Sequence, residues 1–183
     1  MPVNWLFIGE QEGAGLCDGY VPVANTSESG VTIATGVDLG QMSAAGLSTL
    51  AISEELKDKL RPYCGLRKAS AVECLAARPL RITRDECTEL DRAIQAGHLA
   101  EIAAAYNAAH PAKPFEQLPE RAQTVIASVA FQYGSLRVRC PRFWSASVRQ
   151  NWRDVIGELE NFGDAYGPRR RREAEYLRAV LDA

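Results

Sequence analysis

The spacing of apolar residues predicts a chain that is mainly helical, with one small β element near its start. Apolar side chains between Asn4 and Glu12 favour a short buried helix that the glycines following it would end. Between Gly19 and Gly36, β-branched and aromatic residues flank a turn-rich segment. This pattern predicts a β-hairpin with a long loop. From Asp38 onward the pattern is helical almost to the end of the chain.

Capping residues and helix breakers divide the helical part into segments. Ser53, Ser70 and Thr83 each precede an apolar-periodic segment, and we expect each to cap the helix that follows it. Residues 84–109 predict two neighbouring helices joined by a short kink. Residues 118–133 are rich in small and β-branched side chains that permit close packing. They predict the central buried helix.

Length and composition limit the possible classes of protein. The chain has 183 residues, of which 46% are hydrophobic, and shows no repeat or linker, so we expect residues 1–183 to form a single domain. A net charge of −2 offers no cationic surface of the kind that nucleic-acid binding needs. Charged residues interrupt every apolar run, and the first residues show no signal peptide. We therefore expect no membrane span and no nucleic-acid partner. We also expect a monomer.

The five cysteines lack the C-x-x-C spacing of a zinc site. Buried free thiols and disulfides formed in an oxidising compartment are both compatible with their positions. Cys64, Cys74 and Cys87 are close in sequence and lie on predicted helical segments that could pack together. In oxidised protein we expect at least one intramolecular disulfide from this group.

Several other chemistries find little support in the sequence. Neither His98 nor His110 lies beside a serine or cysteine motif that would suggest a nucleophile pair, and both are read as surface residues. The glycines between residues 36 and 40 lack the spacing of a phosphate-binding loop. The four arginines at 169–172 precede glutamates and are read as a solvated, internally paired face.

The polar groups that remain gather around the first helix and the hairpin. They are Glu10, Glu12, Asp18, Thr32, Thr35 and Asp38. Glycoside hydrolysis uses such groups, because one carboxylic acid protonates the leaving oxygen while a second carboxylate activates water or stabilises positive charge on the sugar. This acid–base chemistry needs only tuned carboxylates. We therefore expect no metal and no organic cofactor.

Three motifs in this region form a distinctive pattern. They are Glu12-Gly13, Gly19-Tyr20-Val21-Pro22, and Ser29-Gly30-Val31-Thr32-Ile33-Ala34-Thr35-Gly36-Val37-Asp38-Leu39-Gly40-Gln41. Together they resemble the pesticin-type muramidase domain, a relative of phage lysozyme, and weaker similarity continues through residues 122–128 and 161–174. The resemblance agrees with a lysozyme-like α+β fold that is mainly helical. We expect a small β-hairpin lobe, a larger helical lobe and a substrate cleft between them.

The resemblance implies roles for three residues. Glu12 would be the general acid, Thr32 would help to hold the attacking water, and Asp38 would be the second carboxylate. In phage lysozyme an aspartate follows shortly after the first tyrosine of the hairpin, whereas here Val21-Pro22 follows Tyr20. The role of that aspartate is implied to have moved to Asp38. No substrate-binding residue is assigned.

Structural alternatives to these roles stay open. Asp38 could only cap the next helix, and Thr32 could be an ordinary strand residue. Glu10 lies two residues from Glu12, so a small shift of the alignment would exchange them. We favour Asp38 over Asp18, because Asp18 lies in what we expect to be a flexible approach to the first strand and Asp38 directly follows the second.

The resemblance implies a bacteriolytic glycosidase that cleaves the MurNAc-GlcNAc β-1,4 bond of the peptidoglycan glycan strand. Peptidoglycan lies outside the cytoplasmic membrane, so we expect a delivered toxin or effector, or a phage endolysin, acting in the periplasm or cell wall of a target bacterium. An immunity protein that blocks the cleft would then be its protein partner. The alternatives are a lytic transglycosylase, which can work with one glutamate, and a catalytically silent helical module that binds wall glycans or a protein.

Overall fold

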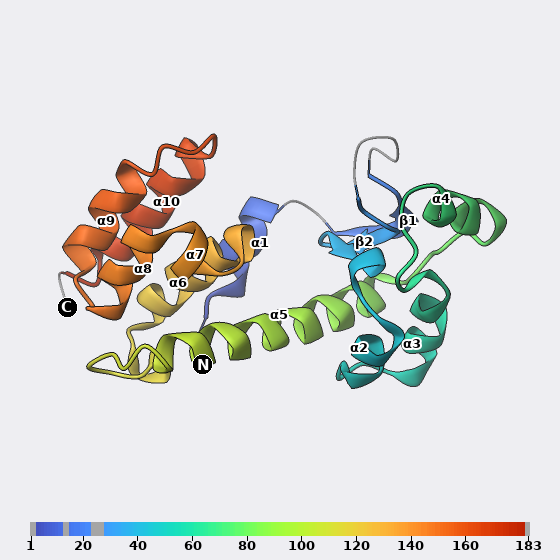
Figure 1. The fold of residues 1–183 in the computed structure, drawn as a ribbon, viewed down its shortest axis with the longest axis horizontal. Helices are drawn as coiled ribbons and strands as arrows, with labels where there is room; N and C mark the ends of the chain where they lie inside the picture. The colour runs from blue at the N-terminus through green and yellow to red at the C-terminus, as the bar shows by residue number, and fades with distance from the viewer. Residues whose placement is uncertain (1–2, 13–14, 23–27, 182–183) are drawn as a thin grey trace. The chain divides into compact units, whose positions relative to one another are not determined.

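The computed structural model describes residues 3–12, 15–22 and 28–181 (Figure 1). The chain forms two compact units. We call residues 12–97 the sheet unit, and residues 1–11 together with 98–183 the helical unit. Each unit has its own cluster of buried apolar side chains.

The sheet unit contains three short antiparallel strands, β1 (Leu16–Tyr20), β2 (Thr32–Ala34) and β3 (Val37–Asp38), in that order. Strands β1 and β2 form the predicted hairpin, although β1 begins at Leu16, before the predicted start at Gly19, and the third strand was not predicted. The chain reverses between β2 and β3 through Gly36, whose φ of +92° is a backbone conformation that glycine adopts without strain. The middle of the predicted long loop, residues 23–27, lies outside the described residues.

Short helices complete the sheet unit. They are η1 (Leu39–Gln41), α2 (Ala44–Thr49), α3 (Glu54–Leu60), η2 (Arg61–Tyr63) and α4 (Lys68–Ala77). They pack around side chains that the sheet buries completely, such as Val31 and Ile33. The apolar residues of the sheet unit therefore form a small hydrophobic core of their own.

The three predicted caps have different outcomes. Ser53 directly precedes α3, as expected, although its hydroxyl bonds to Glu89 instead of the helix. Ser70 is not a cap, because α4 has already begun at Lys68 and the Ser70 hydroxyl donates to a carbonyl oxygen of the preceding turn. Thr83 is a cap: its hydroxyl accepts from the Glu86 N–H at 3.2 Å, and the Glu86 carboxylate accepts from the Thr83 N–H at 2.8 Å. This reciprocal pair is a capping box.

Helix α5 (Arg84–Asn107) is continuous, so the prediction of two helices joined by a kink was wrong. Gly97 lies inside it and costs about 1 kcal/mol of helix propensity, but no proline interrupts the backbone hydrogen bonds of these 24 residues. Leu90 is buried in the core of the sheet unit and Leu99 in that of the helical unit. Burial of apolar side chains before and after Gly97 therefore outweighs the weak tendency of glycine to interrupt the helix.

Helix α1 (Trp5–Glu12), which belongs to the helical unit up to Gln11, confirms the predicted first helix. The other elements of the helical unit after α5 are η3 (Phe115–Gln117), α6 (Glu120–Tyr133), α7 (Leu136–Arg139), α8 (Pro141–Val148), α9 (Trp152–Glu160) and α10 (Gly167–Arg178). Nine consecutive residues of α6, 122–130, are buried, which confirms the predicted central helix. Helix α10 packs along α9 and also contacts α6 (Figure 1).

A buried ionic network joins α6 to α10, and it corrects the reading of the four arginines as a solvated face. Arg170 is only 1% exposed, and its guanidinium donates to Asp164 at 2.9 Å and also to Glu173, which is fully buried. Ser128 on α6 donates to the same Glu173 carboxylate at 2.6 Å. Internal pairing was therefore expected correctly, whereas Arg170 is not exposed to solvent. A buried charge is tolerated because it is paired and hydrogen-bonded.

The network also shifts the titration of its members. Burial raises the pKa of Asp164, but the hydrogen bonds from Tyr133 and Arg170 outweigh burial and hold that pKa below its ordinary value. Burial, followed by the hydrogen bond to Asp164, raises the pKa of Tyr133 to about 12. Ionised Asp164 therefore stabilises the fold above its ordinary pKa, and this contribution is lost as the pH falls through the lowered value.

Replacing Arg170 by methionine should lower the free energy of unfolding by about 3–5 kcal/mol, because it leaves buried carboxylates without their partner. Urea unfolding followed by circular dichroism measures the change. Arg171→Met on the same helix is the matched control, since Arg171 is exposed, and its effect should stay within about 0.5 kcal/mol. Equal effects of the two substitutions would show that the network does not stabilise the helical unit.

Candidate active site

Thr32 and Asp38 lie directly opposite each other on strands β2 and β3. Opposite residues of an antiparallel pair place their side chains on the same face of the sheet, with Cβ atoms about 5 Å apart. The structure therefore brings together two of the three residues that the sequence proposed for catalysis.

The carboxylate of Asp38 is held by the backbone through one of its two oxygens. Its Oδ1 accepts hydrogen bonds from the N–H groups of Gly30 and Gly40, each at 2.9 Å. Asp38 is thereby the N-cap of η1, which is the structural alternative that the sequence left open. Within the described part of the chain, no hydrogen bond reaches Oδ2. The carboxylate thus has a fixed orientation and an oxygen that remains available.

The backbone passes very close to itself at Gly30 and Gly40, the two residues whose N–H groups bind Asp38. A Cβ on Gly40 would lie 2.5 Å from the Leu66 carbonyl oxygen and 2.6 Å from the Cα of Gly30. A Cβ on Gly30 would overlap the same carbonyl oxygen. Only glycine fits at these two positions. The Arg67 guanidinium donates a further hydrogen bond to the Gly40 carbonyl oxygen at 2.9 Å.

Thr32 is buried, with 4% of its surface exposed. Its hydroxyl donates a long hydrogen bond of 3.4 Å to the Gly30 carbonyl. Burial in a strand is what its structural alternative, an ordinary strand residue, would also show. Its function in holding water therefore remains a proposal.

The turn between β2 and β3 is attached to α5 by a residue that the sequence did not single out. The Thr35 hydroxyl donates to Oδ1 of Asp91 at 2.5 Å, and the Thr35 N–H donates to the same atom at 3.2 Å. These groups are 56 positions apart in sequence, so no local pattern could have paired them. Asp91 thereby fixes the turn that joins β2, which carries Thr32, to β3, which carries Asp38.

Asp18 differs from its expected setting. It lies within β1 and forms a bridge with Arg81, so its placement in a flexible approach to the strand was wrong. Its carboxylate accepts from the Arg81 guanidinium at 2.5 Å, and both side chains are largely exposed. This hydrogen bond also raises the pKa of Arg81. The Asp18 carboxylate is thus already engaged by a cation, in contrast to that of Asp38.

Glu10 and Glu12 stand near the end of α1, as predicted. Glu10 is exposed, whereas the side chain of Glu12 lies outside the described part of the structure. The choice between them therefore rests on the sequence motif, and the separation of the Glu12 and Asp38 carboxyl groups stays a prediction.

All five cysteines lie in the described part of the chain and are free thiols. The sulfur atoms in contact are those of Cys17 and Cys87, at 3.4 Å. Cys64 and Cys74 instead approach backbone carbonyl oxygens. The structure places the Cys87 sulfur against Cys17 of β1, outside the expected group, and the formation of a disulfide in oxidised protein stays a prediction.

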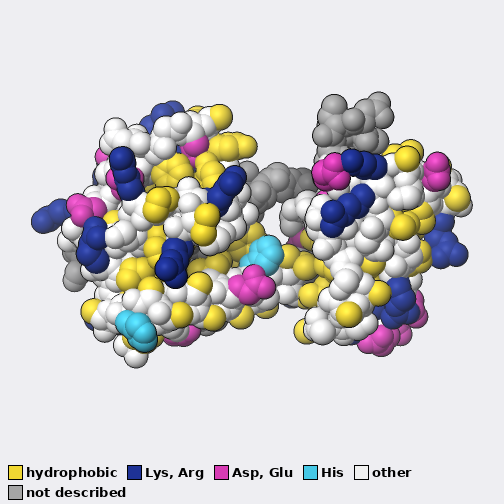
Figure 2. Space-filling model, viewed as in Figure 1, with side chains coloured by type: hydrophobic (Ala, Val, Ile, Leu, Met, Phe, Trp, Pro, Cys, Tyr) yellow, Lys and Arg dark blue, Asp and Glu magenta, His cyan; other side chains and the backbone are white. Residues whose placement is uncertain are grey.

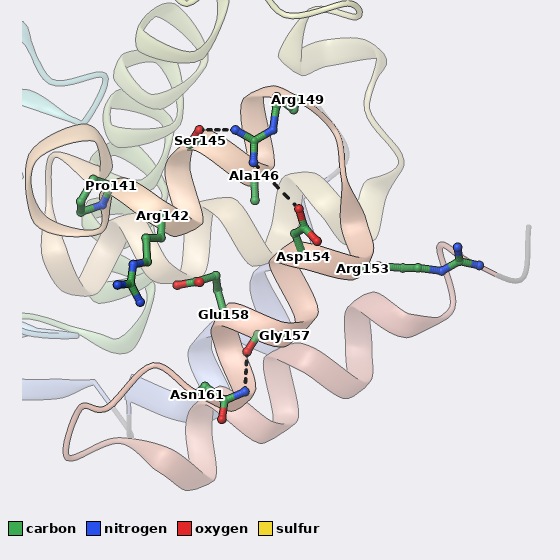
Figure 3. Close-up of a pocket in the computed structure, with 10 residues that line it drawn as sticks. All are labelled: Pro141, Arg142, Ser145, Ala146, Arg149, Arg153, Asp154, Gly157, Glu158 and Asn161. Carbon is green, nitrogen blue, oxygen red and sulfur yellow. Dashed lines mark hydrogen bonds and ion pairs between the residues drawn. The ribbon is translucent and has the colours of Figure 1, made fainter.

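Two pockets of the helical unit contain none of the three proposed catalytic residues. One, of about 630 Å³, lies between α8 and α9 and is lined by charged side chains, among which Arg149 pairs with Asp154 at 3.9 Å (Figure 3). The other, of about 480 Å³, is mainly apolar and includes Phe131 and Trp144. At its edge the exposed His98 ring lies 4.9 Å from that of Phe131, centroid to centroid.

The described residues were also considered for other kinds of site. No three His, Cys, Asp or Glu side chains among them are grouped so that they could bind a metal ion. None of the described helices has the length and apolar content that crossing a bilayer requires. On the face shown in Figure 2, basic and acidic side chains are interspersed.

A mainly helical chain with a small antiparallel sheet agrees with the expected lysozyme-like α+β fold. Comparison with protein families supports this class: the family model for pesticin, described as a bacterial toxin homologue of phage lysozyme, C-terminal part, matches residues 3–153. The chain belongs to the pesticin family. This confirms the expected family and fold, and the match includes Glu12, Thr32 and Asp38. A search of curated proteins found no match.

Gly40→Ala should destabilise the protein by about 3 kcal/mol, because the added methyl group would overlap backbone atoms that cannot move independently. Gly97→Ala is the matched control. Nothing lies within 4 Å of a Cβ at this position in α5, so this substitution should stabilise by about 0.5–1 kcal/mol. Opposite signs in thermal unfolding would confirm the close approach of the backbone, and a neutral Gly40→Ala would contradict it.

Proposed function

We propose that this chain is a muramidase, a glycosidase that hydrolyses the β-1,4 bond between N-acetylmuramic acid and N-acetylglucosamine in bacterial peptidoglycan. The observation that carries the proposal is the family match over residues 3–153, which spans all three proposed catalytic residues. The fixed position of Asp38 opposite Thr32 supports it.

In the proposed reaction, Glu12 donates a proton to the glycosidic oxygen as the bond to the sugar breaks. The available oxygen of Asp38 either accepts a proton from the attacking water or stabilises positive charge on the sugar ring, and Thr32 helps to orient that water. An inverting mechanism requires about 6.5–9.5 Å between the two carboxyl groups, whereas a retaining one requires about 5–5.5 Å. Rigid attachment of Asp38 to the backbone suits either role, because catalysis depends on fixed geometry.

The site of action follows from the substrate. Peptidoglycan lies outside the cytoplasmic membrane, so the enzyme acts in the periplasm or wall of a target bacterium after delivery as a toxin or effector, or after release as an endolysin. The description of the family as a bacterial toxin supports the first route. In this proposal residues 1–183 act as one monomeric domain, and the producer protects itself with an immunity protein that blocks the substrate cleft.

One observation favours a second candidate, a lytic transglycosylase. Because Asp38 already caps η1, it would be present for structural reasons even in an enzyme that uses only a glutamate. Such an enzyme closes the muramic acid onto itself and uses no water.

Digestion of purified peptidoglycan by the full chain, followed by mass spectrometry, separates the candidates. A muramidase leaves reducing N-acetylmuramic acid ends, which incorporate one oxygen from ¹⁸O-labelled water. A transglycosylase leaves anhydro ends without the label. Absence of products from folded protein would overturn both and favour a binding module.

Glu12→Gln should reduce the rate of peptidoglycan hydrolysis by several orders of magnitude, because an amide cannot supply the proton that the leaving oxygen needs. Glu10→Gln removes the same charge two residues away and should have little effect, which makes it the matched control. Turbidity loss of a peptidoglycan suspension measures both rates. The reverse order of the two variants would show that Glu10 is the general acid.

A further inference from the structure

The contact between Cys17 and Cys87 joins two parts of the sheet unit that are distant in sequence. Cys17 lies in β1 and is half-buried, whereas Cys87 is buried in the first turn of α5. Their sulfur atoms are 3.4 Å apart, although the residues are separated by 70 positions. A disulfide has a sulfur–sulfur distance of about 2.05 Å, so closing the bond needs a movement of little more than 1 Å.

Backbone hydrogen bonds already hold the segments that carry the two thiols. The Ile82 N–H donates to the carbonyl oxygen of Cys17 at 2.9 Å, and the Gly19 N–H donates to that of Leu80 at 2.9 Å. The Arg84 guanidinium donates to the Gly15 carbonyl at 3.0 Å. The segment that leads into α5 is therefore hydrogen-bonded to β1 before any covalent bond forms. These hydrogen bonds hold the two sulfur atoms in contact.

The other cysteines provide no comparable pair. Cys64 and Cys74 each lie 3.8 Å from a carbonyl oxygen within their own part of the unit. Cys140 is buried in the helical unit. The contact between Cys17 and Cys87 is thus a specific feature of the fold and not a consequence of a cysteine-rich composition.

We propose that Cys17 and Cys87 are a redox modification site that closes to an intramolecular disulfide on exposure to a disulfide oxidant such as oxidised glutathione. The thiolate of Cys17, the more exposed of the two, attacks the external disulfide and releases one thiol. Cys87 then loses its proton and displaces the second thiol from Cys17. In total the two cysteines give up two protons and two electrons, and the oxidant is reduced to two thiols.

The environment of Cys87 assigns the order of these steps. Burial, its hydrogen bond with Cys17, and the nearby charge of Asp91 raise the pKa of Cys87 to about 12, and the opposing effect of Arg84 is smaller. Since only a thiolate is nucleophilic, Cys87 is unsuited to attack an external oxidant. It reacts once Cys17 holds the mixed disulfide beside it.

The consequence of the bond for the enzyme rests on the proposed function. A chain made in a reducing cytoplasm would keep both thiols, and the same chain delivered to an oxidising periplasm would close the bond. The loop that the disulfide closes contains Thr32 and Asp38. The disulfide restricts the conformations of the unfolded chain and should raise the melting temperature by on the order of 10 °C. Oxidation would therefore stabilise the site in the compartment that holds the substrate.

Peptide mapping of the full chain tests the bond directly. Reduced protein is incubated with oxidised glutathione, the remaining thiols are alkylated, and the protein is digested with trypsin. The five cysteines fall on five different tryptic peptides, with Cys17 in residues 1–57 and Cys87 in residues 85–92. We expect these two peptides to be joined, with a mass two hydrogen atoms below the sum of the free thiol peptides.

Two serine variants provide the controls. Cys17→Ser should abolish both the joined peptide and the rise in melting temperature on oxidation, whereas Cys64→Ser should retain both. Five alkylated cysteines after oxidation, or a link that involves Cys64, Cys74 or Cys140, would overturn the proposal. Because mapping does not depend on hydrolysis, a joined peptide in a protein that leaves peptidoglycan intact would reject the muramidase and retain the disulfide site.

Discussion

The hydrogen bonds from two backbone N–H groups to one oxygen of Asp38 hold the candidate site of the sheet unit together. They join Gly30, two residues before β2, to Gly40 in η1, which follows β3, and they do so where Gly30 and Gly40 leave no space for a side chain. Hydrogen bonds to a carboxylate are stronger than those between neutral groups. The strand pair that places Thr32 opposite Asp38 therefore depends on a residue that also belongs to the proposed site.

Because the cap uses only one oxygen, Asp38 can be both a helix cap and a catalytic residue. A cap uses one carboxylate oxygen, and general-base or charge-stabilising chemistry can use the other. The cap also gives the second oxygen a fixed direction, which a freely rotating surface carboxylate lacks. Asp18 shows the contrast, since it is exposed and paired with Arg81. The second attachment of the hairpin, from Thr35 to Asp91, fixes the opposite end of the same two strands.

Features set by neighbouring residues could be predicted from the sequence, and features set by distant contacts could not. The first helix, the hairpin and the helix cap at Thr83 follow from local patterns, and a short motif singles out Thr32 and Asp38. Strand β3, which places these two residues opposite each other, was not predicted. The continuity of α5 through Gly97 depends on burial in two separate cores. The burial of Arg170 depends on carboxylates that only the packing of α10 brings to it. Contacts of this kind have no periodic signal in the sequence.

The most direct test of the account is to measure stability and hydrolysis together in Asp38→Asn. An asparagine oxygen can still accept both backbone hydrogen bonds, so the free energy of unfolding should fall by only about 1–2 kcal/mol through loss of the charge. Peptidoglycan hydrolysis by the folded variant should be lost, because an amide can neither accept a proton from water nor carry the negative charge. Asp18→Asn, which removes an exposed carboxylate, should retain most activity. Near-normal hydrolysis by folded Asp38→Asn would contradict the account and leave Asp38 with its capping role alone.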